Sequence, residues 1–261
     1  MPHAFVNSRI GLPFVVLDKV DSTNNYAIGQ IHAGLATHGQ AYFALHQYAG
    51  KGQRGKLWNA VPGENITISI ILSPDFLNNQ HPFLLSAAVA LSCIDLFDHL
   101  GLSELSIKWP NDIYWRDRKA GGILIENLYR ANEWNYAVVG IGLNINQISF
   151  PNLENVPVSL KQITGSDHDT IALAKELCVK LNLRYDQLYK GSGVEMLKEY
   201  NSLLYERGKT VKLKKGNIVF ETIVDHVSIS GELYTRDSME RIFSFGEVEW
   251  LRGHPAGRQV E

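Results

Sequence analysis

The sequence predicts an α/β (α+β) fold, in which strands and helices alternate, followed by a small domain made of strands. Apolar runs of strand length, such as residues 65–72 and 136–146, are interleaved with long helical segments at 82–99 and about 167–190. After residue 208 the pattern changes to short alternating segments separated by glycines, which is typical of a small β-barrel of SH3-like size. We therefore predict one domain over residues 1–207 and a second over residues 208–261.

The composition is that of an ordinary globular protein. Apolar residues make up 45% of the chain and charged residues 20%, which suits a sizeable buried core. The formal net charge of −2 gives no general attraction to nucleic acid. Cys93 and Cys178 lie in apolar helical runs, which favours buried thiols, and no cysteine or histidine spacing indicates a disulfide framework or a metal site. Because the start does not resemble a leader and no uninterrupted apolar run is of bilayer length, we expect a cytoplasmic protein.

Residues that begin or end helices bound the elements of the first half of the chain. Pro82 suits the first turn of a helix, and Gly101 ends it. Pro110 cannot donate a ladder hydrogen bond, so a strand breaks there. In order, we predict strands at 14–17, 41–45 and 65–72, a helix between the capping residues Asp21–Thr23 and about His32, a helix at 82–99, and strands at 107–109, 119–126 and 136–146.

The second half is predicted to pass from helices to short strands. Residues 150–165, with Pro151 and Pro157, are expected to form a loop. In order, we then predict helices from about Asp167 or Asp169 to Lys190 and from Val194 to Tyr205, and strands at 210–214, 220–224, 232–235, 241–245 and 247–250.

The segment 50–56, followed by Trp58, has the composition of an anion-binding loop. Its alternate glycines let main-chain N–H groups approach a ligand, and Lys51, Arg54 and Lys56 supply cations of the kind that hold phosphate or carboxylate oxygens. Trp58 offers a flat apolar face on which a purine could rest. Taken alone, the run fits a solvated hairpin loop equally well. Its spacing is neither that of a P-loop nor that of a Rossmann fingerprint.

Other polar residues stand at the ends of predicted elements or beside glycines. Lys119 precedes the pair Gly121-Gly122, which leaves space beside it, so it is a better candidate for chemistry than a surface lysine. Glycines at 140 and 142 inside a strand indicate the close approach of another backbone or of a ligand. Taken singly, Ser22 and Thr23 fit helix caps, Gln47 fits a surface side chain, and Asn111-Asp112 fits a turn.

Four motifs occur together in a set order. They are Asp21-Ser22-Thr23-Asn24, Gln47 with Ala49–Gly55, Lys108–Asp112 with Arg118–Glu126, and Gly140–Asn144. From about Phe14 onward the chain thereby resembles biotin–protein ligases, also called biotin–acetyl-CoA-carboxylase ligases. The resemblance implies a mixed sheet flanked by helices, related to class II aminoacyl-tRNA synthetases, with a small C-terminal barrel. It also implies formation of biotinyl-5′-adenylate from biotin and ATP, with Mg²⁺ on the ATP phosphates, and transfer of biotin to a lysine of a biotin carboxyl carrier domain of a carboxylase.

The resemblance further implies roles for individual residues. Lys119 would contact the biotin carboxylate and the α-phosphate, Asp112 would orient or deprotonate the acceptor amine, and Arg54 would supply a loop cation. The implied biotin-binding residues are Ser22, Thr23, Asn24, Gln47, Gly50, Lys51, Gly52, Gln53 and Lys119. The implied adenylate-binding residues are Lys51, Gln53, Arg54, Trp58, Asn111, Lys119, Gly142 and Asn144. No residue is assigned to a resident metal, and the loop is expected to order over the adenylate.

Two departures from the family pattern bear on function. Lys51 stands where arginine is usual, and Gln53 where some relatives have arginine; because lysine lacks the bidentate fork, we expect looser holding of the adenylate. The Ser-Thr-Asn motif begins at Ser22, so we expect a ligase without an N-terminal DNA-binding domain and without nucleic-acid or membrane partners, while homodimerisation stays open.

Two other activities compete with that of a biotin ligase. A lipoate– or octanoate–protein ligase would share the scaffold, but its Arg-Arg…Gly-Gly-Gly…His signature is missing. A non-catalytic biotin-binding regulator is disfavoured because Lys119 and Asp112 are both present.

Overall fold

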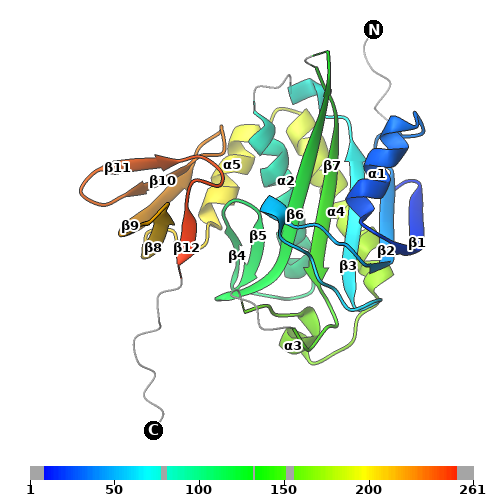
Figure 1. The fold of residues 1–261 in the computed structure, drawn as a ribbon, viewed down its shortest axis with the longest axis horizontal. Helices are drawn as coiled ribbons and strands as arrows, with labels where there is room; N and C mark the ends of the chain where they lie inside the picture. The colour runs from blue at the N-terminus through cyan, green and yellow to red at the C-terminus, as the bar shows by residue number, and fades with distance from the viewer. Residues whose placement is uncertain (1–8, 78–80, 132, 151–155, 252–261) are drawn as a thin grey trace.

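The computed structural model describes residues 9–77, 81–131, 133–150 and 156–251 (Figure 1). Its helices are α1 (Thr23–His32), α2 (Pro82–His99), α3 (Leu160–Thr164), α4 (Thr170–Tyr189) and α5 (Gly193–Ser202). Its first seven strands are β1 (Phe14–Val20), β2 (Ala41–Gln47), β3 (Asn65–Leu72), β4 (Leu105–Lys108), β5 (Asp112–Trp115), β6 (Arg118–Arg130) and β7 (Glu133–Asn144). The last five are β8 (Thr210–Lys215), β9 (Ile218–Val227), β10 (Leu233–Arg236), β11 (Glu240–Phe243) and β12 (Glu249–Leu251).

The strands form two separate sheets. The larger has seven strands in the order β1-β2-β3-β7-β6-β5-β4, and the smaller has five in the order β11-β10-β9-β8-β12. In the larger sheet β1 and β2 run parallel and the other neighbours run antiparallel, so the sheet is mixed. The smaller sheet is antiparallel throughout. The predicted α/β fold with a separate set of C-terminal strands is confirmed at this level.

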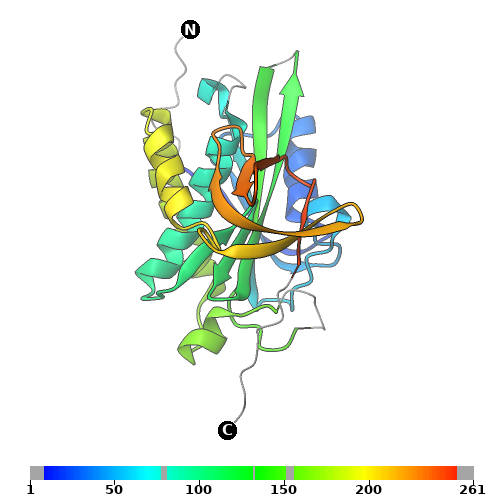
Figure 2. The ribbon, with the colours of Figure 1, turned by 90° about the vertical axis from the view of Figure 1, so that its left-hand side faces the viewer.

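The two faces of the larger sheet are covered differently. Helices α2 and α4 lie on one face, while α1 and the segment between β2 and β3 lie on the other (Figures 1 and 2). In β3 the isoleucines 66, 68 and 70 belong to the main core beneath α2 and α4. Thr67 and Ser69, which alternate with them, are also buried, but their hydroxyls face the other side of the sheet. One face therefore carries the main core, and the other, which we call the polar face, carries these hydroxyl groups beside a smaller apolar cluster under α1.

Helix α2 spans the residues that the sequence predicted for it. It is apolar and long enough to cross a membrane by length and composition, but 72% of its window is buried within the protein. Burial raises the pKa of Cys93 in α2, and that of Cys178 in α4, to about 12, which confirms the prediction of buried thiols. Helix α2 is therefore the central helix of the core.

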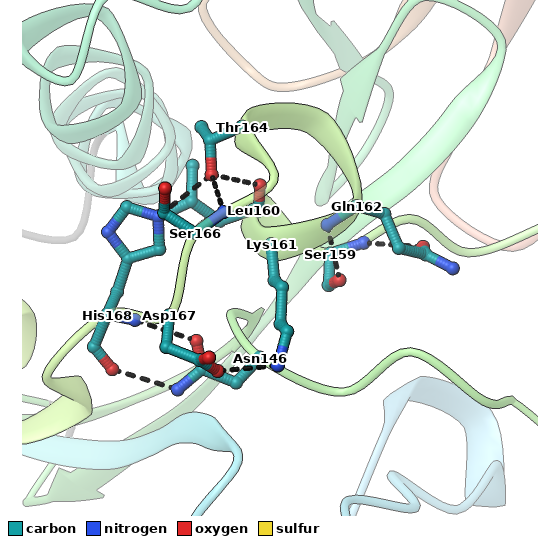
Figure 3. Close-up of polar contacts among 9 residues, drawn as sticks. All are labelled: Asn146, Ser159, Leu160, Lys161, Gln162, Thr164, Ser166, Asp167 and His168. Carbon is teal, nitrogen blue, oxygen red and sulfur yellow. Dashed lines mark hydrogen bonds and ion pairs between the residues drawn. The ribbon is translucent and has the colours of Figure 1, made fainter.

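The predicted loop at 150–165 is wrong in its last part, where α3 forms (Figure 3). The Ser159 hydroxyl accepts a hydrogen bond from Gln162 N at 3.2 Å, and Gln162 Oε1 accepts one from Ser159 N at 3.1 Å. This capping box satisfies the first free N–H groups of a helix too short to show apolar periodicity. The Ser-x-x-Gln spacing was the available signal. Residues 151–155 of the predicted loop lie outside the described residues.

An ion cluster joins the helices α2, α4 and α5. The Arg184 guanidinium on α4 donates to Asp95 on α2 at 2.6 Å and to Glu199 on α5 at 2.7 Å. The bond to Asp95 is the main cause that raises the pKa of Arg184. Only 13% of the Arg184 side chain is exposed, and its removal leaves the carboxylates of Asp95 and Glu199 without their shared cation, although 28% and 43% of these side chains are exposed.

We expect Arg184→Met to lower the free energy of unfolding by about 2 kcal/mol, a value reduced from that of a fully buried pair because Glu199 is partly exposed. Urea denaturation measures it. Arg116→Met is the matched control, because the Arg116–Glu104 pair has more than half of each side chain exposed, at 56% and 53%. Equal unfolding curves for the two variants would contradict the assignment.

The smaller sheet is packed against the larger one through α5 and the turn after β4. Trp109 Nε1 donates to Gly231 O at 2.9 Å. The Asn201 side chain of α5 accepts from Val227 N at 2.7 Å and donates to Val227 O at 2.9 Å. Side chains of both sheets belong to one continuous core. Of the two predicted domains, 1–207 and 208–261, the first eight residues of the first and residues 252–261 of the second lie outside the described residues.

Candidate active site

Strand register hollows out the polar face of the larger sheet. Asp112 on β5 pairs with Gly122 on β6, Gly122 pairs with Gly142 on β7, and Gly142 pairs with Thr67 on β3. The next row in the same direction joins Leu124, Gly140 and Ser69. Because three of these positions have no side chain, the sheet leaves a cavity of about 470 Å³, counting the space that is continuous with solvent.

Most of the predicted site residues meet in this cavity. Those that line it are Ser22, Thr23, Asn24, Gln47, Lys51, Gly52, Gln53, Trp58, Asn111, Lys119 and Gly142. Four others, Gly50, Arg54, Asp112 and Asn144, do not line it. Lining residues that sequence reasoning did not select are Thr67, Ile68, Ile123, Leu124 and Ile141. Their apolar strand pattern indicated burial, and nothing in it distinguished the cavity face from the core face.

One end of the cavity holds an ion pair. Lys119 Nζ lies 2.6 Å from Asp112 Oδ1, with 23% and 18% of the two side chains exposed. A Cβ added at Gly122 would lie 3.2 Å from Lys119 Nζ and 3.4 Å from Asp112 Oδ1, so this glycine gives the pair its space. Although Asp112 does not line the cavity, it is in direct contact with the ammonium group that does. A partly desolvated ammonium group can neutralise two anions brought together beside it.

The backbone of Lys119 is held from several directions. Its N–H donates to Val156 O at 3.0 Å, and its carbonyl accepts from Val158 N at 2.8 Å and from Asn144 Nδ2 at 3.2 Å. The same Asn144 amide donates to Val158 O at 3.2 Å. Asn144 is thus placed to position Lys119, and its predicted contact with the nucleotide stays a prediction.

The other end of the cavity is formed by amide and hydroxyl groups. Gln47 Oε1 accepts from Thr23 N at 2.7 Å and from Thr23 Oγ1 at 3.0 Å. Ser22 is the N-cap residue of α1, but its side chain makes no capping hydrogen bond. Ser22 lines the cavity although only 2% of the residue is exposed, so it remains a candidate for binding a ligand while the capping interpretation of its side chain is not supported. The cavity end therefore offers both donors and acceptors.

The glycine-rich loop folds back on itself above the sheet. Trp58 N donates to Gly50 O at 2.9 Å, and Gly52 N donates to Lys56 O at 2.7 Å. A Cβ at Gly50 would lie 2.4 Å from Trp58 O, so only glycine fits at this position when the two ends of the loop are paired. Lys51 lines the cavity, whereas the Arg54 side chain lies against Gly246 in the turn before β12, within 3.6 Å of a Cβ placed there. A role for Arg54 in catalysis stays a prediction that requires the loop to move.

The Trp58 indole packs directly against Gly142 of strand β7. A Cβ at Gly142 would lie 2.4 Å from its Cε2 atom, so only glycine admits the indole there. The Trp58 ring centroid is 6.0 Å from Lys119 Nζ. Its buried Nε1 has no hydrogen-bond partner among the described residues. The two strand glycines that the sequence singled out thus make room for side chains, with Asn24 against Gly140 and Trp58 against Gly142.

A known protein family matches the segment of the chain that forms this cavity. The sequence profile of the biotin/lipoate A/B protein ligase family matches residues 16–144, which contain all the strands of the larger sheet from β2 to β7 and most of β1. This chain carries a biotin/lipoate A/B protein ligase family domain. The matched segment also contains every cavity-lining residue named above.

Individual relatives of this ligase-family domain resemble different shares of the chain. The bifunctional ligase/repressor BirA of Escherichia coli (strain K12) is 35% identical over 136 residues, which are 50% of this chain and 40% of that protein. The biotin–[acetyl-CoA-carboxylase] ligase of Paracoccus denitrificans is 34% identical over 137 residues, which are 50% of this chain and 53% of the relative. The chain spans about half the length of the curated relatives it matches.

The resemblance of folds extends further along the chain. The structure of the biotin protein ligase from Aquifex aeolicus in complex with biotin and ATP has a TM-score of 0.77 with this chain, at 24% identity. The alignment covers 92% of this chain and 98% of that one. Both sheets therefore belong to the shared fold.

Proposed function

We propose that this protein is an ATP-dependent biotin–[biotin carboxyl carrier protein] ligase, which forms biotinyl-5′-adenylate and transfers biotin to a lysine of a carrier domain. The observation that carries the proposal is one cavity with the Lys119–Asp112 pair at one end and the Gln47–Thr23 group at the other. A ligand with a carboxylate at one end and a polar ring at the other fits these two ends of the cavity. Family membership and relatives named as biotin ligases support the same activity.

In the proposed first step the biotin carboxylate attacks the α-phosphorus of ATP. A P–O bond to the α-phosphorus forms, the bond to the β-phosphate oxygen breaks, and pyrophosphate leaves with the electron pair. Both reactants are anions, so the barrier falls when a fixed cation lies between them. We assign this place to the Lys119 ammonium, and Lys51 of the loop, which also lines the cavity, would supply a second cation. Mg²⁺ arrives with the ATP phosphates as part of that substrate.

In the proposed second step the amine of the acceptor lysine attacks the acyl carbon of the adenylate. An amide bond forms, the bond to the phosphate oxygen of AMP breaks, and one amine proton is released. The Asp112 carboxylate lies 2.6 Å from Lys119 Nζ and so stands beside the reacting carboxyl group, where it can take this proton.

The larger-scale assignments belong to the same proposal. We propose that residues 1–207 form a catalytic domain related to class II synthetases and that 208–261 form an SH3-like domain, which the second antiparallel sheet supports. The proposed partner is the carrier domain of a carboxylase, and the proposed location is the cytoplasm. Among the described residues no group of three or more His, Cys, Asp and Glu could hold a metal ion.

The proposed function is tested by offering the purified protein Mg²⁺-ATP with either biotin or lipoate and following pyrophosphate release. A second reaction adds an apo carrier domain and follows its mass. We expect biotin to support both pyrophosphate release and the mass increase, and lipoate to support neither. Release with lipoate would favour a lipoate ligase, and biotin binding without transfer would favour a regulator.

Gly142→Ala tests the place of Trp58 in this scheme. The new methyl group would lie 2.4 Å from the indole, so the Trp58 ring must move away from β7. We expect the KM for ATP to rise about tenfold, with a smaller effect on biotin affinity. Gly29→Ala in α1 is the control, because a Cβ there has no atom within 4 Å. Unchanged ATP kinetics in Gly142→Ala would show that the nucleotide does not depend on Trp58.

A further inference from the structure

One lysine of the larger sheet extends its ammonium group among three aromatic rings. It is Lys108, the last residue of β4. Its Nζ lies 5.0 Å from the ring centroid of Tyr114 on β5, 5.6 Å from that of Tyr205 after α5, and 5.4 Å from that of Trp250 on β12. The ammonium group also donates to Tyr114 Oη at 3.3 Å. We call this arrangement the Lys108 cage.

The Lys108 cage is a contact between the two sheets that depends on charge. An ammonium group within about 6 Å of a ring centroid is attracted to the electron-rich face of the ring. The rings also contact one another, with centroids 4.9 Å apart for Tyr114 and Tyr205 and 6.2 Å apart for Tyr205 and Trp250. Because Trp250 belongs to the smaller sheet and Lys108 to the larger, the attraction holds β12 against the end of β4.

Backbone hydrogen bonds fix the segments that carry the rings. Strand β4 is the last strand of the larger sheet, and the chain after α5 follows its outer edge. Ile107 N donates to Leu203 O at 2.8 Å, and Tyr205 N donates to Ile107 O at 2.9 Å. Trp250 pairs with Leu213 of β8. The rings are thus held before the lysine side chain is placed, which reduces the entropy lost on ordering it.

Lys108 lies directly across the strand pair from Asp112. The two residues are register partners in β4 and β5, so their side chains leave the same face of the sheet. The turn between them is closed by Asn111 N, which donates to Lys108 O at 3.2 Å, and Asn111 Nδ2 donates to Ile123 O at 2.7 Å. Asp112 contacts Lys119 Nζ at 2.6 Å. A shift of Lys108 is therefore passed to the Asp112 carboxylate through one register pair and one short turn.

We propose that Lys108 is a positioning residue for Asp112, and that its cage lets the smaller sheet hold the Asp112 carboxylate in place for biotin transfer. The inference rests on the proposed function, in which Asp112 takes a proton from the acceptor amine. A base acts within hydrogen-bond reach of that proton, and a displacement of about 1 Å lowers a rate on the order of 10²-fold. The Lys119 backbone has separate supports from Asn144 and Val158, so adenylate formation should depend less on the cage.

Two variants break the cage from opposite sides. Lys108→Met removes the charge and keeps the length of the side chain, and Trp250→Leu removes one ring. In each we expect single-turnover transfer from preformed biotinyl-adenylate to an apo carrier domain to fall about tenfold, with adenylate formation within about threefold of the parent. Because both changes break the same contact, the double variant should lose about as much as one single variant, not the product of the two. Lys108→Arg keeps a cation among the rings and should stay within about twofold of the parent.

The matched control is Lys175→Met. Lys175 Nζ lies 5.5 Å from the ring centroid of Phe14 on β1, at the opposite edge of the larger sheet. Loss of this cation–π contact should leave the ratio of the transfer rate to the adenylation rate unchanged. Amide hydrogen exchange of residues 109–115 adds a readout that needs no activity. We expect faster exchange there in Lys108→Met and Trp250→Leu, with exchange of β3 unchanged, which separates loosening of the turn from general destabilisation.

Several results would overturn the inference. An unchanged ratio of the two rates in both Lys108→Met and Trp250→Leu would do so, even if the parent is a fully active biotin ligase. Equal losses in both steps would show general damage to the cavity instead of positioning. Recovery of the Trp250→Leu rate on adding Lys108→Met would show that a released ammonium group, and not a lost anchor, disturbs Asp112. If the parent forms no adenylate and transfers no biotin, the proposed function fails, while exchange of residues 109–115 still decides whether the cage holds the turn.

Discussion

Lys119→Ala is expected to lower biotinyl-adenylate formation by a factor on the order of 10²–10³, because the variant loses the fixed cation between two reacting anions. The Lys119 ammonium is held by Asp112 at 2.6 Å and by a backbone tied on both sides, so no other side chain can take its place without rearrangement. Biotin affinity should largely survive, because the Gln47–Thr23 group lies at the opposite end of the cavity. Pyrophosphate release measures the first effect and calorimetry the second.

The matched control is Lys198→Ala, which removes an exposed lysine of α5 away from the cavity. Its rate should equal that of the parent. Near-normal pyrophosphate release in Lys119→Ala would refute the role assigned to this residue. Loss of biotin binding together with activity would instead show that Lys119 organises the whole cavity.

Asp112→Asn is expected to slow transfer from preformed biotinyl-adenylate to the carrier lysine by about 10²-fold at neutral pH, because the acceptor amine loses its base. The variant depends on amine that is already deprotonated. With a lysine pKa of about 10.4, that fraction grows about tenfold per pH unit through the neutral range. The rate of the variant should therefore rise more steeply with pH than that of the parent, and the deficit should shrink as the pH increases.

Single-turnover transfer at several pH values measures this effect separately from adenylate formation. Asp117→Asn is the control, because it makes the same change on the exposed turn between β5 and β6. If Asp112→Asn and the parent have the same pH profile, Asp112 is not the base. A uniform loss at every pH would indicate that its role is limited to holding Lys119.

Local physics determined a large part of this protein. Pro82, Gly101 and the apolar body between them specify α2, and Pro110 separates β4 from β5, because each acts on the backbone of its own segment. The isoleucine-rich run 65–72 likewise predicts the buried strand β3, because its apolar character is local to that segment. The four motifs also named most of the residues that line the cavity, but only through their resemblance to biotin–protein ligases, because taken singly Ser22, Thr23 and Gln47 fit ordinary structural roles.

Tertiary structure alone decided how those residues meet. Alternation along a strand shows which side chains share a face, but it does not say which strand lies next or in which register. The row Asp112–Gly122–Gly142–Thr67 crosses the consecutive strands β5, β6 and β7 and then β3, which lies far away in sequence, and it turns separate glycines into one cavity floor. The same register brings Glu126 and Ser69 behind Asn24, directs Asn144 to the Lys119 backbone, and leaves Arg54 beside Gly246. Long-range pairing depends on the sum of many packing contacts, so no single segment of the chain contains it.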